Sequence, residues 1–254
     1  MAEGPKTALV TGGARRIGRA IVEDLAANGF AVAIHAHRST GEADALKRSI
    51  IERGGSATVV EADLSEAGAV AGLVGKAAGL LGPVGLLVNN ASAFEPDTVA
   101  DFDWETWDRH FALHLKAPVM LARQLAAGLA DDQEGLVVNV IDERVVRLNP
   151  RYFSYTLSKA ALWTATQTMA QAFGPKVRVN AIGPGPTLAN VRQRPEDFQA
   201  QIDGLILGRG PDLAEFGATV RYLWQARSVT GQLIAIDGGQ HLAWQTPDVT
   251  GMNE

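Results

Sequence analysis

The first thirty residues hold the pattern that most restricts the fold of this chain. Residues 6–11 (KTALVT) form a short apolar run, which predicts a buried strand. The run leads into a glycine-rich turn at residues 11–18 (TGGARRIG), and a helical pattern continues to residue 29. Glycines let the backbone approach a pyrophosphate closely, and a helix N-terminus presents free N–H groups to it. This order of strand, turn and helix predicts a dinucleotide site, with an ordinary strand-to-helix turn as the alternative.

The alternation of strand and helix continues along the chain. We expect helical patterns at residues 42–53, 104–130 and 151–173, and strands near residues 6–11, 31–35, 56–60, 84–89, 135–141, 176–182 and 232–236. Right-handed crossovers then give a Rossmann-type, doubly wound α/β sheet of about seven parallel strands flanked by helices. No Pro/Ser-rich linker or charge block divides the 254 residues, so we expect a single domain over residues 1–254.

A Tyr-x-x-x-Lys pair lies in the helical stretch at residues 151–173. Tyr155 and Lys159 are four residues apart, so they share one helical face. We expect the lysine ammonium to favour the phenolate and to lower the tyrosine pKa from about 10, which makes a proton donor near neutral pH. The pair alone is weak evidence, because this spacing also occurs on solvated helices.

Two further predicted strands end in polar or turn-forming residues. Residues 86–92 (LLVNNAS) are an apolar strand that ends in two asparagines, and residues 177–185 (VRVNAIGPG) run into a Pro-Gly turn. Strand ends of this kind meet at the ligand crevice of a parallel sheet. In order and spacing, these segments, the glycine-rich turn and the Tyr/Lys pair resemble the short-chain dehydrogenase/reductase family. The resemblance runs from Lys6 to about Leu242 and includes residues 229–232 (VTGQ) and 236–239 (IDGG).

The end of the second predicted strand distinguishes the two nicotinamide cofactors. An acid there would bind the free ribose 2′-hydroxyl of NAD, whereas an arginine suits the 2′-phosphate of NADP. Residues 34–40 (IHAHRST) contain no acid, and Arg38 can pair with a phosphate through two hydrogen bonds. Ser39 can donate another, and Arg15 adds charge from the facing turn. We therefore predict NADP(H), with a solvated basic loop as the alternative.

Three positions depart from the usual family pattern. Most relatives have a third glycine at Arg16, a serine at Asp142 and an asparagine at His114. The departures could mark an inactive relative, but they fit a subfamily better. Arg16, Asp142 and a phenylalanine at position 94 together resemble the pteridine reductase and dihydromonapterin reductase branch, as does the segment at residues 37–39 (HRS).

That resemblance implies hydride transfer from the nicotinamide to a C=N carbon of a pterin. Phe94 would stack the flat ring against the nicotinamide, and Arg16 would reach both the cofactor phosphates and the substrate. Asp142 would join Tyr155 in proton delivery. The structural alternatives are a core aromatic for Phe94 and an acid paired with Arg144 for Asp142.

His114 has two open interpretations, a proton-relay member or a satisfied helix histidine. Pro118 lies four residues later in the same helical pattern, where it must free the carbonyl of His114. A freed carbonyl beside the site could hold a relay water, as the family's asparagine does by another route.

The resemblance assigns roles to individual positions. The catalytic residues would be Asp142, Tyr155 and Lys159. The cofactor would contact Gly12, Arg15, Arg16, Ile17, Gly18, His37, Arg38, Ser39, Asp63, Leu64, Asn90, Ala91, Ser92, Tyr155, Lys159, Pro184, Gly185 and Thr187. The substrate would contact Arg16, Ser92, Phe94, Asp142 and Tyr155, beneath a variable lid at about residues 188–209. Asp63 resembles the family's adenine-contacting acid, and capping of the next helix is its alternative role.

Composition narrows the possible partners. A net charge of −5 argues against a general nucleic-acid binder, and the absence of cysteine excludes disulfides and thiolate sites. The five histidines show no His-Glu-x-x-His pattern, so no metal is expected. Residues 1–6 lack the apolar region of a signal peptide, and no segment reaches the ~18 apolar residues of a membrane span. We expect a cytoplasmic protein that acts on a small molecule.

The predicted helices at residues 104–130 and 151–173 carry apolar residues on more than one face, including residues 161–163 (ALW). Relatives pair these helices, so we expect a homodimer or homotetramer. Two other functions remain open, a carbonyl or 3-oxoacyl reductase and a nucleotide-binding regulatory protein. The intact pair of Tyr155 and Lys159 argues against the second. The tail at residues 240–254 has no assigned role.

Overall fold

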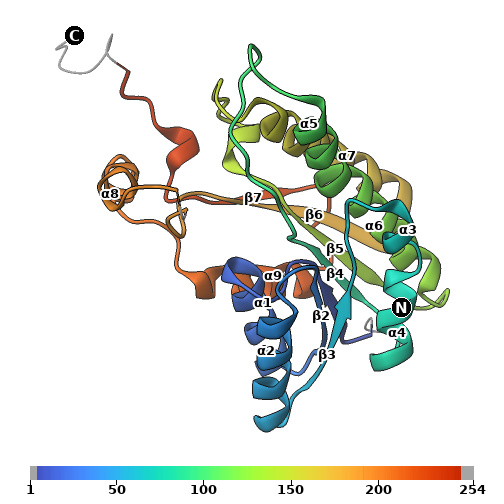
Figure 1. Ribbon diagram of the computed structural model, residues 1–254. Coiled ribbons are helices and arrows are strands. Elements are labelled where there is room, and N and C mark those ends of the chain that lie inside the picture. The colour runs from blue at the N-terminus through green and yellow to red at the C-terminus, as the bar shows by residue number, and fades with distance from the viewer. Residues whose placement is uncertain (1–4, 191, 247–254) are drawn as a thin grey trace.

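The computed structural model describes residues 5–190 and 192–246 (Figure 1). Seven strands form one parallel sheet in the order β3-β2-β1-β4-β5-β6-β7. They are β1 (Thr7–Val10), β2 (Ala31–Ala36), β3 (Ser56–Glu61), β4 (Leu86–Asn89), β5 (Gly135–Val140), β6 (Val177–Pro184) and β7 (Leu233–Ile236). The predicted doubly wound α/β fold is confirmed. Residues 1–4 of the N-terminal segment and residues 247–254 of the tail lie outside the described residues.

Helices cover both faces of the sheet (Figure 1). One face carries α1 (Arg16–Ala27), α2 (Thr40–Glu52) and α9 (Leu213–Gln225). The other carries α3 (Ala67–Val70), α4 (Leu73–Leu81), α5 (Trp104–Phe111), η1 (Ala112–Lys116), α6 (Ala117–Gly128) and α7 (Phe153–Phe173). The short helix α8 (Pro195–Asp203) lies apart from both layers (Figure 1). Two 3₁₀ turns, η2 (Glu143–Val145) and η3 (Gln240–Leu242), follow β5 and β7.

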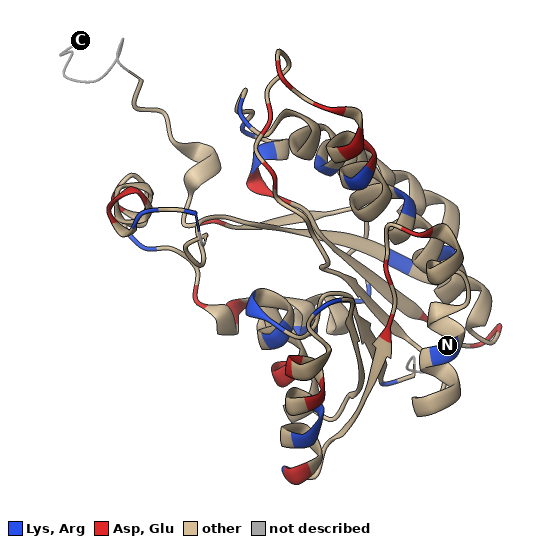
Figure 2. Ribbon diagram, in the orientation of Figure 1, with Lys and Arg blue, Asp and Glu red and all other residues tan. Residues whose placement is uncertain are grey.

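Strand side chains alternate between the two layers, as the period of two requires. Val10 and Ile34 pack against α1 and α9, whereas Leu9 and Leu87 pack against α4 and α6, and all four are fully buried. Figure 2 shows that the strands carry almost no charged residues, which lie mainly on the outer helices and loops. A parallel sheet buried on both faces therefore accounts for the near-continuous apolar runs in the sequence.

The predicted continuous helix at residues 104–130 is wrong in one respect. A π-helical segment, η1, separates α5 from α6, and Pro118 lies in the first turn of α6. Proline supplies no N–H, and its ring clashes with the carbonyl four residues earlier, so the wider turn accommodates it. His114 lies inside this segment. The other predicted elements begin and end within about two residues of those observed.

Across the described part of the chain, no helix combines the length and apolar character needed to cross a membrane.

Candidate active site

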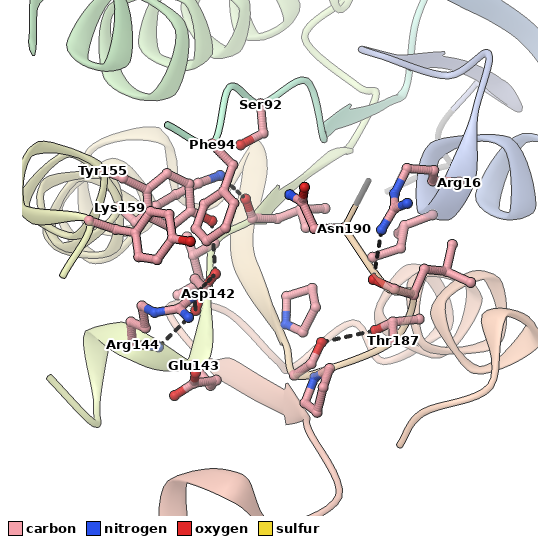
Figure 3. Close-up of a pocket in the computed structure, with 18 of the residues that line it drawn as sticks. Arg16, Ser92, Phe94, Asp142, Glu143, Arg144, Tyr155, Lys159, Thr187 and Asn190 are labelled. Carbon is pink, nitrogen blue, oxygen red and sulfur yellow. Dashed lines mark hydrogen bonds and ion pairs between the residues drawn. The ribbon is translucent and has the colours of Figure 1, made fainter. Parts of the chain in front are cut away.

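A cavity of about 880 Å³ opens at the carboxyl ends of the central strands (Figure 3). It collects most of the predicted site residues from four separate parts of the chain. Its lining includes Gly12, Arg15, Arg16, Ile17, Gly18, Asn90, Ala91, Ser92, Phe94, Asp142, Tyr155, Lys159, Pro184, Gly185 and Thr187. Figure 3 shows Tyr155, Asp142 and Phe94 grouped on one side and Arg16 on the other.

Five predicted cofactor residues do not line this cavity: His37, Arg38, Ser39, Asp63 and Leu64. They follow β2 and β3, the strands beyond β1 at that edge of the sheet. Arg38 is exposed to solvent there, and His37 Nε2 lies 3.5 Å from Asp63 Oδ2.

Asp63 does not cap a helix, so that alternative role is wrong. The next helix begins at Ala67 and follows Glu66. Asp63 Oδ1 instead accepts hydrogen bonds from the backbone N–H of Ser65 at 2.9 Å and from its hydroxyl at 2.6 Å. These donors lower the pKa of the Asp63 carboxyl, with the Ser65 hydroxyl as the largest cause. The carboxylate stabilises the turn that follows β3.

The glycine-rich turn between β1 and α1 leaves no room for side chains at two positions. Gly12 has a φ of +60°, and a Cβ on Gly18 would lie 2.2 Å from the Gly12 carbonyl oxygen. The Asn90 side chain donates to the carbonyls of Thr11 and Gly12 at 2.9 and 3.1 Å and fixes the turn against β4. Such a close backbone at a helix N-terminus suits a pyrophosphate.

Arg16 adopts a backbone conformation that favours glycine. Its φ of +51° is in the left-handed region, where a side chain is strained. Its guanidinium donates to the carbonyls of Ala189 and Leu188 at 3.1 and 2.9 Å, which ties the turn to the start of the predicted lid. Arg15 forms an ion pair with Glu42 on α2, so the positive charge expected from Arg15 already has a partner.

Sequence reasoning missed His35, which supports the same turn from β2. Its Nδ1 accepts the Gly12 N–H at 3.1 Å, and its Nε2 lies 3.0 Å from the Ala62 carbonyl. Burial lowers the pKa of His35 to about 4, so the ring is neutral and can accept that bond. A lone histidine in an apolar strand gives no sequence signal for this role.

Asp142 contacts both Tyr155 and Arg144, the two partners considered for it. Its Oδ2 accepts the Tyr155 hydroxyl at 2.8 Å. Its Oδ1 accepts the backbone N–H of Arg144 at 3.0 Å, and the Arg144 guanidinium lies 3.3 Å from Oδ2. The carboxylate that contacts the tyrosine is therefore held in place by its own turn, η2.

The predicted lowering of the Tyr155 pKa is wrong. Burial raises the pKa of Tyr155 well above its usual value, and the negative charge of Asp142 and its hydrogen bond raise it further. Lys159 Nζ donates to the Val140 carbonyl at 2.8 Å and lies 5.7 Å from the centre of the Tyr155 ring. Burial also lowers the pKa of Lys159 to about 8. Tyr155 is therefore a protonated phenol that donates to a carboxylate.

Phe94 belongs to the cavity wall, so the alternative of a core aromatic is wrong. The ring is half-buried and stacks on Tyr152 with 4.1 Å between centroids and 12° between planes. It meets Tyr155 edge-on at 4.8 Å, and the Arg144 guanidinium lies 5.3 Å from its centroid. Tyr152 was not predicted, and its left-handed φ of +62° at the start of α7 leaves no trace in the sequence.

His114 is a bridging residue with partners on both ring nitrogens. Nδ1 lies 2.8 Å from Ser158 Oγ, and Nε2 lies 3.0 Å from Ser92 Oγ. Burial lowers its pKa well below the usual value, and the nearby Lys159 acts in the same direction. The ring is therefore neutral, and it matches the satisfied helix histidine, one of the two interpretations considered for it. His114 does not line the cavity, but it contacts Ser92, which does.

Glu143 is a second unpredicted member of the cavity lining. It is 5 % exposed, and its carboxyl has no hydrogen-bonding partner among the residues that the structure describes. Burial raises the pKa of Glu143 to about 7, and the charge of Asp142 adds to this effect. The charges of Arg144 and Arg147 lower this pKa by smaller amounts, and the charge of Asp237 raises it.

Comparisons with known proteins agree with this geometry. The family model for short chain dehydrogenases matches residues 6–200. The crystal structure of FolM alternative dihydrofolate reductase 1 from Brucella canis, complexed with NADP, is 61 % identical and superposes with a TM-score of 0.94, covering 96 % of this chain and 97 % of that one. L-xylulose reductase from Bos taurus is 34 % identical over 242 residues, which cover 92 % of this chain and 96 % of the relative. A 3-oxoacyl-[acyl-carrier-protein] reductase from Synechocystis is 28 % identical, with 92 % and 96 % coverage.

The matched motifs run from the glycine-rich turn to the Tyr155/Lys159 helix and meet in one cavity. The parallel sheet, its strand order and the extent of the matches agree with one another. The chain belongs to the short-chain dehydrogenase family.

Proposed function

We propose that this protein is an NADPH-dependent reductase that adds a hydride to a C=N bond of a pterin-like substrate. The observation that carries the proposal is the flat aromatic wall of Phe94 beside the Tyr155–Asp142 pair in a single cavity. A wall of this kind favours a planar ring, and a carboxylate beside it accepts the ring's N–H groups. Similarity to a dihydrofolate reductase structure supports the choice, because dihydrofolate contains a pterin ring.

The cofactor site is proposed from the shape of the turn. The close approach of Gly12 and Gly18 and the N-terminus of α1 suit a pyrophosphate, while His37, Arg38 and Ser39 lie at the end of β2 where a 2′-phosphate would extend. The similarity to a protein crystallised with NADP supports the same cofactor. When bound, the reduced nicotinamide supplies a hydride from C4. Asp63 and Leu64 would then lie near the adenine.

The protein's own groups would handle the proton. A hydride and one proton convert C=N to CH–NH, so the site needs an acid that is protonated at neutral pH. Tyr155 satisfies this need because its pKa is raised, and Asp142 holds its hydroxyl at 2.8 Å. The Lys159 ammonium would stabilise the phenolate left after transfer and hold the nicotinamide ribose. Asn90, Ala91, Ser92, Pro184, Gly185 and Thr187 would line the nicotinamide end.

Arg16 and the lid would close the other side of the substrate site. Arg16 already hydrogen-bonds the turn to residues 188–189, so the same side chain would contact both the cofactor and the lid. We propose that residues 188–209 act as the lid of a single domain. α8 supplies Asp197, Phe198 and Gln201 to the cavity lining.

A carbonyl or 3-oxoacyl reductase is the second candidate, favoured by the similarity to L-xylulose and 3-oxoacyl reductases. Asp142→Ser tests the two directly, because it restores the residue that most of the family carries. A pterin reductase should lose dihydropterin turnover by about tenfold or more, since the carboxyl is part of the proton path. A ketone reductase should keep or improve turnover of a 3-ketoester. An unchanged dihydropterin rate with a faster ketoester rate would decide for the second candidate.

A further inference from the structure

Two His–Ser pairs join α5 and η1 to α7 beside Tyr155. His110 Nδ1 lies 2.7 Å from Ser154 Oγ, and His114 Nδ1 lies 2.8 Å from Ser158 Oγ. The two histidines are four residues apart, and so are the two serines, so the two pairs lie one helical turn apart and side by side. The two imidazoles stack with 5.4 Å between their centroids. The pairs therefore form two neighbouring polar cross-links between α5–η1 and α7.

The two cross-links end on different residues of the loop that follows β4. The Ser154 hydroxyl donates to Asp97, so the His110 pair ends in a carboxylate that does not line the cavity. The His114 pair ends at Ser92, whose Oγ lies 3.0 Å from Nε2 and which does line the cavity. The second pair therefore hydrogen-bonds to a cavity-lining residue, whereas His110 meets the Tyr155 ring only edge-on, at 5.9 Å between centroids.

The tautomer of His114 follows from its partners. The backbone N–H of Ala93 points at Nε2 from 3.2 Å, so Nε2 must carry a lone pair. Nδ1 therefore carries the proton and donates it to Ser158 Oγ, whose own hydrogen goes to the Tyr155 carbonyl at 2.7 Å. Burial lowers the pKa of His114, so a second proton does not add at neutral pH. The imidazole is a fixed acceptor toward the loop.

The Ser92 hydroxyl then has a preferred direction. Its hydrogen can go to His114 Nε2 at 3.0 Å, to the Ala93 carbonyl at 3.3 Å, or to the Tyr155 oxygen, where it lowers the pKa of the phenol slightly. The Ala93 carbonyl is beyond the usual range for O–H···O hydrogen bonds, and a hydrogen bond to Tyr155 mainly serves its phenolate form, whereas Tyr155 keeps its proton. Nε2 is therefore the better acceptor, and its lone pair is shared between the Ser92 hydroxyl and the more distant Ala93 N–H. With its hydrogen engaged there, the Ser92 oxygen presents lone pairs to the cavity.

We propose that His114 is a positioning residue that orients the Ser92 hydroxyl so that its oxygen accepts an N–H group of the substrate. The inference rests on the proposed function and extends it to substrate selection. A pterin ring presents N–H and amino donors, whereas the reacting group of a ketone presents an acceptor only. His114 contacts Ser92, and Ser92 contacts the substrate. Through Ser92, His114 thus favours nitrogen heterocycles over ketones.

Three variants separate the two ring nitrogens. In His114→Gln, the side-chain amide reaches the position of Nε2 and keeps an acceptor for Ser92 and Ala93. In His114→Asn, the shorter amide reaches only the position of Nδ1 and keeps the contact with Ser158. Ser92→Ala removes the oriented group itself.

With NADPH and 7,8-dihydropterin, we expect His114→Asn and Ser92→Ala each to raise KM about tenfold, with kcat changed less than about threefold. His114→Gln should restore most of the wild-type KM. The double variant His114→Asn/Ser92→Ala should have no higher KM than Ser92→Ala alone, because the two substitutions remove the same interaction. For a 3-ketoester, His114→Asn should leave KM unchanged or lower it. His110→Asn, a buried control in the other cross-link, should lower the melting temperature without this KM pattern.

The assignment would be overturned if the KM increases of the two single variants multiplied in the double variant, or if KM changed equally for dihydropterin and ketoester. The ¹⁵N shifts of histidine-labelled protein test it without any substrate. Nδ1 of His114 should be protonated and Nε2 bare, and Ser92→Ala should shift the Nε2 signal. A protonated Nε2 would overturn the inference even if pterins are reduced. A wild-type protein with the expected shifts but no dihydropterin activity would instead refute the proposed function alone.

Discussion

At the scale of single residues, the protonation states in the site are set mainly by burial, which disfavours the charged form of each group. Tyr155 keeps its proton because the phenolate would be buried beside Asp142. Glu143 tends to keep its proton for the same reason, whereas Lys159 and His114 are pushed toward their neutral forms. The sequence predicted that Tyr155, Lys159 and Asp142 belong to one site, and all three line the cavity, but it did not predict the direction of the tyrosine pKa shift. That direction depends on the depth of burial and on a contact thirteen residues away, neither of which the spacing of residues contains.

Glu143 should make stability depend on pH. Its folded-state pKa of about 7 exceeds the usual 4.5, so the folded state binds the proton more tightly. The stabilisation is complete below about pH 4.5 and is lost as the pH rises through 7, with a limit of about 3 kcal/mol. Glu143→Gln should therefore be more stable than wild type at pH 8.5, and this advantage should shrink at pH 5. Urea unfolding at both values measures it, with the exposed Glu196→Gln as control. If the free energy of unfolding differed between wild type and Glu143→Gln by the same amount at both pH values, the raised pKa of Glu143 would be contradicted.

Arg38 should decide between the two nicotinamide cofactors. Loss of a charged hydrogen bond to a phosphate costs about 1.5–3 kcal/mol. Arg38→Ala should weaken NADPH binding about tenfold or more and leave NADH binding nearly unchanged, because Arg38 is exposed and supports no core packing. Fluorescence titration with each cofactor measures the ratio. Equal or tighter binding of NADH by the wild-type protein would contradict the account.

At the scale of elements, the strands were predictable and the irregular turns were not. Apolar runs such as residues 86–89 located all seven strands, because a sheet buried on both faces needs them. The π-segment at Ala112–Lys116 was not predicted, although Pro118 was recognised as a disturbance. Proline indicates that a helix must change but not how the neighbouring turn adapts. The Phe94–Tyr152 stack was also missed, since it depends on the path of two loops.

The glycine-rich turn gives a prediction at this scale. Gly18→Ala would place a Cβ 2.2 Å from a backbone carbonyl, so the turn must move, at about 1–3 kcal/mol of stability. NADPH affinity should fall at least tenfold, because the pyrophosphate would lose its close backbone. The matched control is Gly79→Ala within α4, where nothing lies within 4 Å. It should stabilise the protein by about 0.5–1 kcal/mol. Calorimetry with a cofactor titration checks both, and unchanged affinity in Gly18→Ala would rule out the turn as the pyrophosphate site.

At the scale of the whole molecule, exposed apolar residues suggest association between copies. Trp104 is 67 % exposed at the start of α5, and Val99 and Leu157 are also exposed nearby on the loop before α5 and on α7. We propose a homodimer or homotetramer through these helices. Sedimentation at micromolar concentration should give two or four times the chain mass of 26.9 kDa. A single species of one chain mass would contradict the proposal.

We propose that this cavity is where pterins are reduced with NADPH. The most direct measurement is NADPH oxidation by the wild-type protein with dihydropterins, dihydrofolate, quinones and 3-ketoesters in one panel, with Tyr155→Phe as the control. We predict the highest kcat/KM for a dihydropterin or dihydrofolate, and a loss of roughly 100-fold or more in Tyr155→Phe, because a positioned acid contributes about that much. Higher kcat/KM for the 3-ketoesters, or full pterin turnover in Tyr155→Phe, would contradict the account.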